Sequence, residues 1–184
     1  MKQPPLAAGY APVFNVSTGY SVTSLGTPSS GRVVLSGINV SFSADAGKRF
    51  GATLDLGYAQ ASNILNSGHH MSTLSYLVGP IILLSNGSLL STYAHLLAGG
   101  ARVSGPLPGA NGGLSMGLVR YPAWVAGGCA EYRLSRAFGL RVNIDYMHTY
   151  FYNSSQAVRG QNSLRVVNSL VYYLGARSLK RRQE

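Results

Sequence analysis

The segment FGLRVNIDYMHTYFY, residues 138–152, alternates strictly between apolar and polar side chains. One set of alternate positions is bulky and apolar: Leu140, Val142, Ile144 and Tyr146. The positions between them are polar: Arg141, Asn143 and Asp145. Alternation with a period of two is typical of a β-strand with one buried face. The pattern alone leaves open which of the two faces is the interior.

Seven further segments alternate in the same way, and turn-forming residues separate them. The eight predicted strands are 12–22, 33–45, 49–60, 70–84, 90–104, 122–135, 138–151 and 162–175. The connections alternate between short turns (46–49, 85–89, 136–137) and longer stretches rich in Gly, Ser, Asn and Pro (23–32, 61–69, 105–121, 152–161). In an up-and-down meander, successive connections lie at opposite ends of the sheet. Long loops at one end and short turns at the other indicate an all-β, eight-stranded antiparallel transmembrane barrel.

The charged residues inside the predicted strands indicate which face is the interior. Asp55 is out of phase with Leu54 and Leu56, and Arg165 is out of phase with its apolar neighbours. We therefore predict a polar network in the lumen made of Asp55, Glu131, Arg133, Arg141, Asn143, Asp145 and Arg165. The predicted lipid-facing set is Leu54, Leu56, Leu140, Val142, Ile144 and Tyr146. Buried charges must be paired, and the acids and bases of this network roughly balance.

Three positions fit this pattern less simply. The phase of segment 90–104 is ambiguous: if Arg102 is a fourth base in the lumen, His95 faces outward. Pro80 cannot donate to a sheet ladder, so we expect a bulge or a strand end there. Asn168 falls on the outward face of the last strand.

The composition excludes several classes of protein. Charged residues make up 11% of the chain, against roughly 25% in soluble domains. The net charge of +10 comes from a shortage of acids, and the bases form no stripe, so we expect no nucleic-acid partner. No apolar run approaches the ~20 residues of a transmembrane helix. A single cysteine, Cys129, excludes a disulfide framework and a cysteine-based metal site.

The order of several segments also resembles a known family. Residues KRFGATLDLGY, WVAGGCAEYRLSRAFGLRVNIDYMHTYF and QNSLRVVNSLVYYLG resemble the outer-membrane protein β-barrel domain family, the small OmpA/OmpX-like barrels of Gram-negative bacteria. The resemblance covers residues 12–175. It implies an exported barrel in the bacterial outer membrane with periplasmic termini and extracellular long loops. It also implies an insertion signal, whose alternating outward positions are Tyr172 and Leu174.

The expected partners follow from this setting: outer-membrane lipid and, transiently, the barrel assembly machinery. We expect a monomer without a cofactor. Residues 1–11 are expected to be a leader remnant or a periplasmic segment, with any signal peptide removed or upstream, and residues 176–184 a basic tail.

The expected role is structural or adhesive, a barrel with a filled lumen that displays its loops and catalyses no reaction. One alternative is an outer-membrane enzyme similar to a lipid A deacylase, which would use His148 and a loop serine. A second alternative is a soluble lipocalin-like carrier. His69 and His70 are expected to lie in a solvated loop and not in a metal site.

Overall fold

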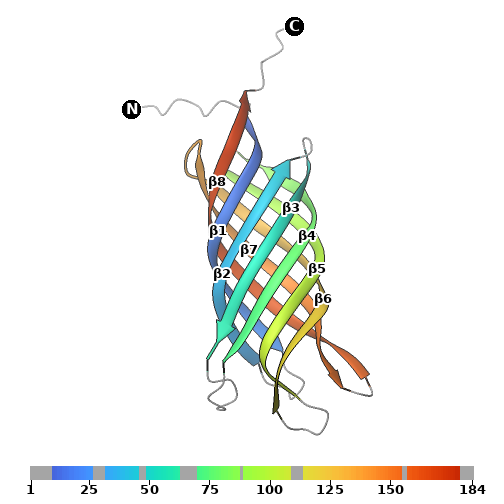
Figure 1. The fold of residues 1–184 in the computed structure, drawn as a ribbon. Helices are drawn as coiled ribbons and strands as arrows, with labels where there is room; N and C mark the ends of the chain where they lie inside the picture. Colours follow the sequence, from blue (N-terminus) through green and yellow to red (C-terminus); the bar gives the residue numbers. More distant parts are fainter. Residues whose placement is uncertain are drawn as a thin grey trace.

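Eight antiparallel strands, each paired with the next in the chain, close into a barrel (Figure 1). The computed structural model describes residues 10–26, 32–45, 49–62, 70–87, 89–108, 114–154 and 157–178. The strands are β1 (Tyr10–Gly26), β2 (Arg32–Asp45), β3 (Phe50–Ala61), β4 (Met71–Asn86), β5 (Leu90–Pro108), β6 (Leu114–Arg133), β7 (Phe138–Ser154) and β8 (Ala157–Ser178). Pairing of β8 with β1 completes the circle, so no strand edge is left open. The predicted fold class is confirmed.

Among the described residues, no helix is long and apolar enough to cross a membrane.

Short turns gather at the end of the barrel where β1 begins and β8 ends (Figure 1). We call this the short-turn end and the opposite one the long-loop end. The connection from β6 to β7 shows why so few residues suffice. The backbone N–H groups of Leu134 and Ser135 both donate to the carbonyl of Phe138, at 3.0 and 2.9 Å. The Ser135 hydroxyl accepts from the N–H groups of Ala137 and Phe138.

Two of the connections predicted to be long loops are mostly strand. Pairing of β5 with β6 continues to Pro108 opposite Leu114, and pairing of β7 with β8 continues to Ser154 opposite Ala157. The predicted loop boundaries 105–121 and 152–161 were therefore wrong. Each hairpin continues as paired strands without an apolar–polar alternation in its sequence, because the backbone groups of its two arms hydrogen-bond to each other. Both hairpins project beyond the barrel at the long-loop end (Figure 1).

Pro80 does not end β4, and the irregularity lies a few residues later. β4 pairs with β3 straight through Pro80, which lies opposite Ala52. The pairing of β4 with β5 keeps one register on both sides of Pro80 and shifts only between Leu83 and Ser85. Strand β4 therefore tolerates the missing donor at Pro80, and the bulge that we expected there is displaced to Leu84.

The barrel interior divides into a polar half and an apolar half. Toward the long-loop end, inward residues from seven strands form an apolar cluster: Leu25, Leu35, Ala59, Met71, Leu77, Leu97, Ala101, Val103, Ala123, Val125 and Met147. Toward the short-turn end most of the inward side chains are charged, amide or hydroxyl groups, and a few apolar ones such as Val167 and Val171 lie among them. The polar network predicted for the lumen lies in the half toward the short-turn end, and the apolar cluster was not predicted.

The apolar cluster makes a direct prediction about stability. Leu35 is 1% exposed inside the cluster, whereas its neighbour Val34 is 60% exposed on the outward face. Leu35→Ala should lower the free energy of unfolding by about 2–4 kcal/mol, because it removes buried methyl groups and leaves a cavity. Val34→Ala should cost less than about 1 kcal/mol. Urea unfolding in lipid vesicles measures both, and equal effects would contradict the assignment of the two faces.

Candidate functional site

The outward face of the barrel carries exposed apolar side chains on every strand. All six residues predicted to face lipid lie there, each between 40 and 57% exposed: Leu54, Leu56, Leu140, Val142, Ile144 and Tyr146. Water-soluble proteins rarely expose a continuous apolar surface of this kind. An apolar outward band is instead the defining surface of a transmembrane barrel.

Exposed aromatic side chains lie toward both ends of this band. Those toward the short-turn end are Phe14, Phe50, Tyr132, Phe138 and Tyr172. Those toward the long-loop end are Tyr58, Tyr76, Trp124 and Tyr146. Some pack on each other, as do Phe138 and Tyr172 with ring centroids 5.3 Å apart. Two aromatic belts of this kind mark the positions of the two membrane–water interfaces.

Inside the barrel, Arg165 on β8 joins two carboxylates from opposite sides of the lumen. Its Nη1 donates to Asp55 on β3 at 2.8 Å, and its Nε donates to Asp145 on β7 at 2.9 Å. The second oxygen of Asp145 lies 2.8 Å from Nε2 of His95 on β5. The second oxygen of Asp55 accepts from Asn39 on β2 at 3.0 Å. This cluster, which we call the Arg165 cluster, therefore connects five strands.

A second cluster, the Arg141 cluster, lies nearer the short-turn end. Arg141 on β7 donates through Nε to Glu131 on β6 at 2.9 Å, and through Nη2 to Asn15 on β1 at 3.0 Å. The other oxygen of Glu131 accepts from the Tyr173 hydroxyl on β8 at 2.7 Å. Hydroxyl pairs fill the neighbouring inward positions, such as Ser17 with Ser41 at 2.6 Å.

Together the two clusters satisfy three buried acids with two buried arginines and several neutral partners. A carboxylate removed from water is stable only with such partners, since its desolvation costs several kcal/mol. Arg133 was predicted to belong to the network, but it joins none of the ion pairs of the two clusters. Its side chain is half-buried and lies over the Tyr173 ring, 5.2 Å from the ring centroid. Asn143 points inward, but its Oδ1 has no hydrogen-bond partner among the described residues.

For β5, whose phase the sequence left open, the alternative with Arg102 inside and His95 outside is wrong. His95 is buried and bonded to Asp145, and Arg102 is exposed on the outward face. The two residues are seven positions apart, so the alternation of β5 places them on opposite faces. His95 and Tyr173 are the network residues that sequence reasoning missed. The sequence signal that could have placed both side chains in the lumen is the alternation of their strands, since the residues on either side of each are apolar and face outward.

No known family profile and no curated protein sequence matches the chain. Solved structures do match over almost its whole length. Neisserial surface protein A aligns with a TM-score of 0.62 at 14% identity, covering 90% of this chain and 99% of that one. The attachment invasion locus protein Ail of Yersinia pestis aligns with a TM-score of 0.57 at 12% identity, covering 91% and 100%.

A third structure, the outer-membrane protein OprG of Pseudomonas aeruginosa, aligns with a TM-score of 0.55 at 13% identity, covering 91% of this chain and 98% of that one. The chain has the fold of the small outer-membrane β-barrels. The soluble lipocalin-like alternative does not fit this fold, because such a carrier needs a polar outward face.

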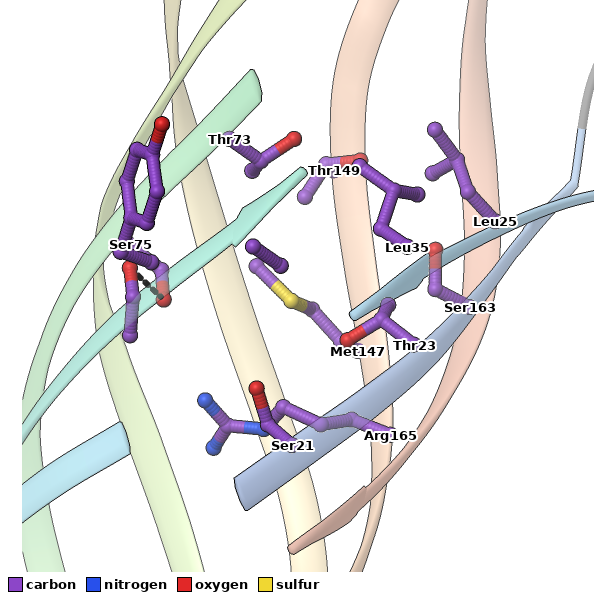
Figure 2. A pocket seen from close by; sticks show the side chains of 13 residues that line it. Ser21, Thr23, Leu25, Leu35, Thr73, Ser75, Met147, Thr149, Ser163 and Arg165 are labelled. Atoms are coloured by element: carbon purple, nitrogen blue, oxygen red, sulfur yellow. Dashed lines mark hydrogen bonds between the residues drawn. The ribbon is translucent and has the colours of Figure 1, made fainter. Parts of the chain in front are cut away.

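A small cavity lies inside the barrel, between the Arg165 cluster and the apolar cluster (Figure 2). Its volume is about 30 Å³, enough for one or two water molecules. Arg165, Thr149 and Ser163 are among the residues that line it. The hydroxyl oxygens of Thr149 and Ser163 are buried and have no protein partner among the described residues. These hydroxyls and the guanidinium are the groups that water in the cavity would bind.

His148, the residue of the catalytic alternative, lies on the outward face toward the long-loop end. Its Nδ1 is 2.6 Å from Oδ1 of Asn162, and its ring lies 5.4 Å from that of Trp124 and 4.8 Å from that of Tyr150. In the part of the chain that the structure describes, the contacts of His148 are with an asparagine amide and two aromatic rings. The geometry is that of a histidine packed within the aromatic belt.

The remaining sequence-predicted positions lie as follows. Tyr172 and Leu174 both point outward near the short-turn end. His69 lies outside the described residues, and Nδ1 of His70 is 3.2 Å from the Ser62 hydroxyl. In the part of the chain that the structure describes, no three potential metal ligands come together.

Asn168 is exposed on the outward face, opposite Tyr20 of β1. Residues 1–9 and 179–184 of the two terminal segments lie outside the described residues.

The Arg165 cluster predicts that Asp145 is indispensable for stability. Asp145→Leu leaves Arg165 and His95 without a shared carboxylate, so the free energy of unfolding should fall by about 3–5 kcal/mol. The matched control is Asn143→Leu, two positions away on the same inward face, which removes an oxygen that has no partner and should change stability by less than about 1 kcal/mol. Denaturant titration in vesicles measures both. A similar small change in both variants would contradict the role of the cluster.

Proposed function

We propose that the protein is a non-catalytic outer-membrane barrel that anchors and displays its long-loop end at the cell surface, in a structural or adhesive role. The observation that carries the proposal is the filled lumen. Two ion-pair clusters block one half of the interior and packed apolar side chains block the other. A lumen filled in this way has no room for a solute pathway.

The shape of the long-loop end supports display. The β5–β6 and β7–β8 hairpins continue past the barrel as paired strands, so they hold their tips away from the membrane (Figure 1). Two of the aligned structures are named as a surface protein and as an attachment invasion locus protein. These names support, for this chain, a role in contact between the cell surface and an external partner.

The membrane setting of the proposal includes lipid around the apolar band and transient contact with the barrel assembly machinery during insertion. Tyr172 and Leu174 are the proposed insertion signal, because both present apolar groups outward on the last strand. The termini are proposed to be periplasmic and the projecting hairpins extracellular. We propose a monomer, since the closed barrel leaves no strand edge to pair with another copy.

Ion conductance tests the filled lumen. The purified protein inserted into a planar lipid bilayer should give no stable single-channel conductance, because no continuous water path crosses the two halves of the interior. Migration on a detergent gel before and after boiling serves as the control for folding, since a folded barrel migrates differently from the unfolded chain. Steady channel openings by the folded protein would rule out the filled-lumen proposal.

Thiol labelling of intact cells tests the orientation. The only native thiol, Cys129, is buried, so the parent chain provides a blank. With a membrane-impermeant maleimide, Ala110→Cys between β5 and β6 should react in intact cells. Leu89→Cys, in the turn between β4 and β5, should react only after the cells are opened. The reverse result would invert the proposed topology, and no reaction at Ala110→Cys would contradict surface display.

A further inference from the structure

Two arginines lie directly opposite each other on the outward face. Arg102 of β5 pairs with Arg120 of β6 in the ladder, and both side chains are exposed. Side chains that face each other across an antiparallel pair have Cβ atoms about 5 Å apart, and like charges in this position repel. The barrel therefore holds an unfavourable pair of charges at a defined place.

Among the described residues, no carboxylate lies beside the pair to neutralise it. Of the five acids, Asp55, Glu131 and Asp145 are held in the lumen clusters. Asp45 ends β2 at the short-turn end, and Glu184 lies outside the described residues. The four stretches that connect strands at the long-loop end contain no acid at all. The described part of the protein therefore supplies no counter-ion, and the pair can take one from outside.

The position of the pair along the barrel selects the kind of counter-ion. Toward the membrane, the next outward residue of β5 is Gly100, and the ring of Tyr76 from β4 lies directly on it. On β6, Trp124 lies two outward positions closer to the membrane than Arg120. The arginines thus come immediately after the aromatic belt, at the level where an apolar surface gives way to lipid headgroups.

We propose that Arg102 and Arg120 together bind the phosphate group of a lipid headgroup in the leaflet at the long-loop end. This inference rests on the membrane setting of the proposed function. A phosphate monoester carries a charge of about −1.5 to −2 at neutral pH, which balances two guanidinium groups. Its oxygens accept paired hydrogen bonds from the planar fork of each arginine. The Tyr76 and Trp124 rings then flank the glycerol and the first part of the acyl chains.

Trp124 makes this site measurable, because it is the only tryptophan in the chain and it is exposed beside the pair. The protein is reconstituted into phosphatidylcholine vesicles that contain a small fraction of a lipid with brominated acyl chains, which quenches nearby tryptophan fluorescence. The brominated lipid is either phosphatidate, a phosphate monoester, or phosphatidylcholine. Phosphatidate should quench Trp124 with an apparent affinity about fivefold higher than that of phosphatidylcholine.

The double variant R102Q/R120Q should lose this preference. The matched control is R32Q, which removes one positive charge from the long-loop end. Arg32 starts β2, away from the pair, and its Nη1 donates to the Ser24 hydroxyl. R32Q should keep the preference. The gel shift on boiling establishes that each variant is folded, and the single variants R102Q and R120Q replace the double variant if it does not fold. A preference that survives in R102Q/R120Q, or that R32Q removes equally, would overturn the proposal.

The same measurement separates the failure of this inference from that of the proposed function. If neither brominated lipid quenches Trp124, the outward face does not contact lipid and the membrane setting itself is wrong. Equal quenching by both lipids leaves the barrel in the membrane and overturns only the phosphate site. The preference should also survive an excess of inorganic phosphate at matched ionic strength. Its loss there would show that the arginines bind soluble phosphate in place of lipid.

Discussion

The bridge that Arg165 makes between Asp55 and Asp145 is the interaction on which the rest of the structure depends. It joins β8 to β3 and β7 across the lumen, and His95 and Asn39 extend it to β5 and β2. These charges are stable away from water only when all of them are paired at once. Pairing requires the sheet to close with its polar face inward, and closure then places the bulky apolar face outward. The transmembrane surface is thus the other side of the same alternation that builds the lumen.

The two halves of the interior, one ionic and one apolar, stabilise the barrel in different ways. The ionic half fixes which strands lie next to one another, because each charged group is satisfied only by hydrogen-bond partners at particular positions on particular strands. The apolar half, around Leu35 and Val125, packs without directional bonds and excludes water below the projecting hairpins. A cavity of about 30 Å³ remains where the two kinds of packing meet. Such a boundary is a natural place for imperfect filling, since neither ion pairs nor methyl groups fit both sides.

The sequence was informative wherever one face of a strand differed clearly from the other. The alternation in β7 predicted the inward positions of Asp145 and Arg141 because apolar residues separate them at every step. It was uninformative in β5, where small residues around Gly99 obscure the phase, and so the sequence left open which of His95 and Arg102 faces the lumen. The strand itself has no such ambiguity, because Asp145 accepts a hydrogen bond from only one of the two residues.

The long-loop end could not be predicted for a different reason. The β5–β6 and β7–β8 hairpins continue through backbone pairing, which no side-chain pattern records. Tyr173 was missed because an aromatic residue between two outward positions looks like part of the same apolar surface. Its hydroxyl can donate a hydrogen bond to Glu131 only when β8 and β6 belong to one closed barrel. Contacts between strands distant in sequence depend on closure, and closure is a property of the whole chain.

The central claim is that the apolar face meets lipid and the polar face does not meet solvent. Spin labels at Ile144→Cys and Asn143→Cys, neighbours on opposite faces of β7, test it directly in vesicles through collision with oxygen and with a water-soluble nickel complex. The account predicts that the label at position 144 collides strongly with oxygen and weakly with nickel, whereas the label at 143 collides weakly with both. Strong nickel collision at position 144 would contradict the account.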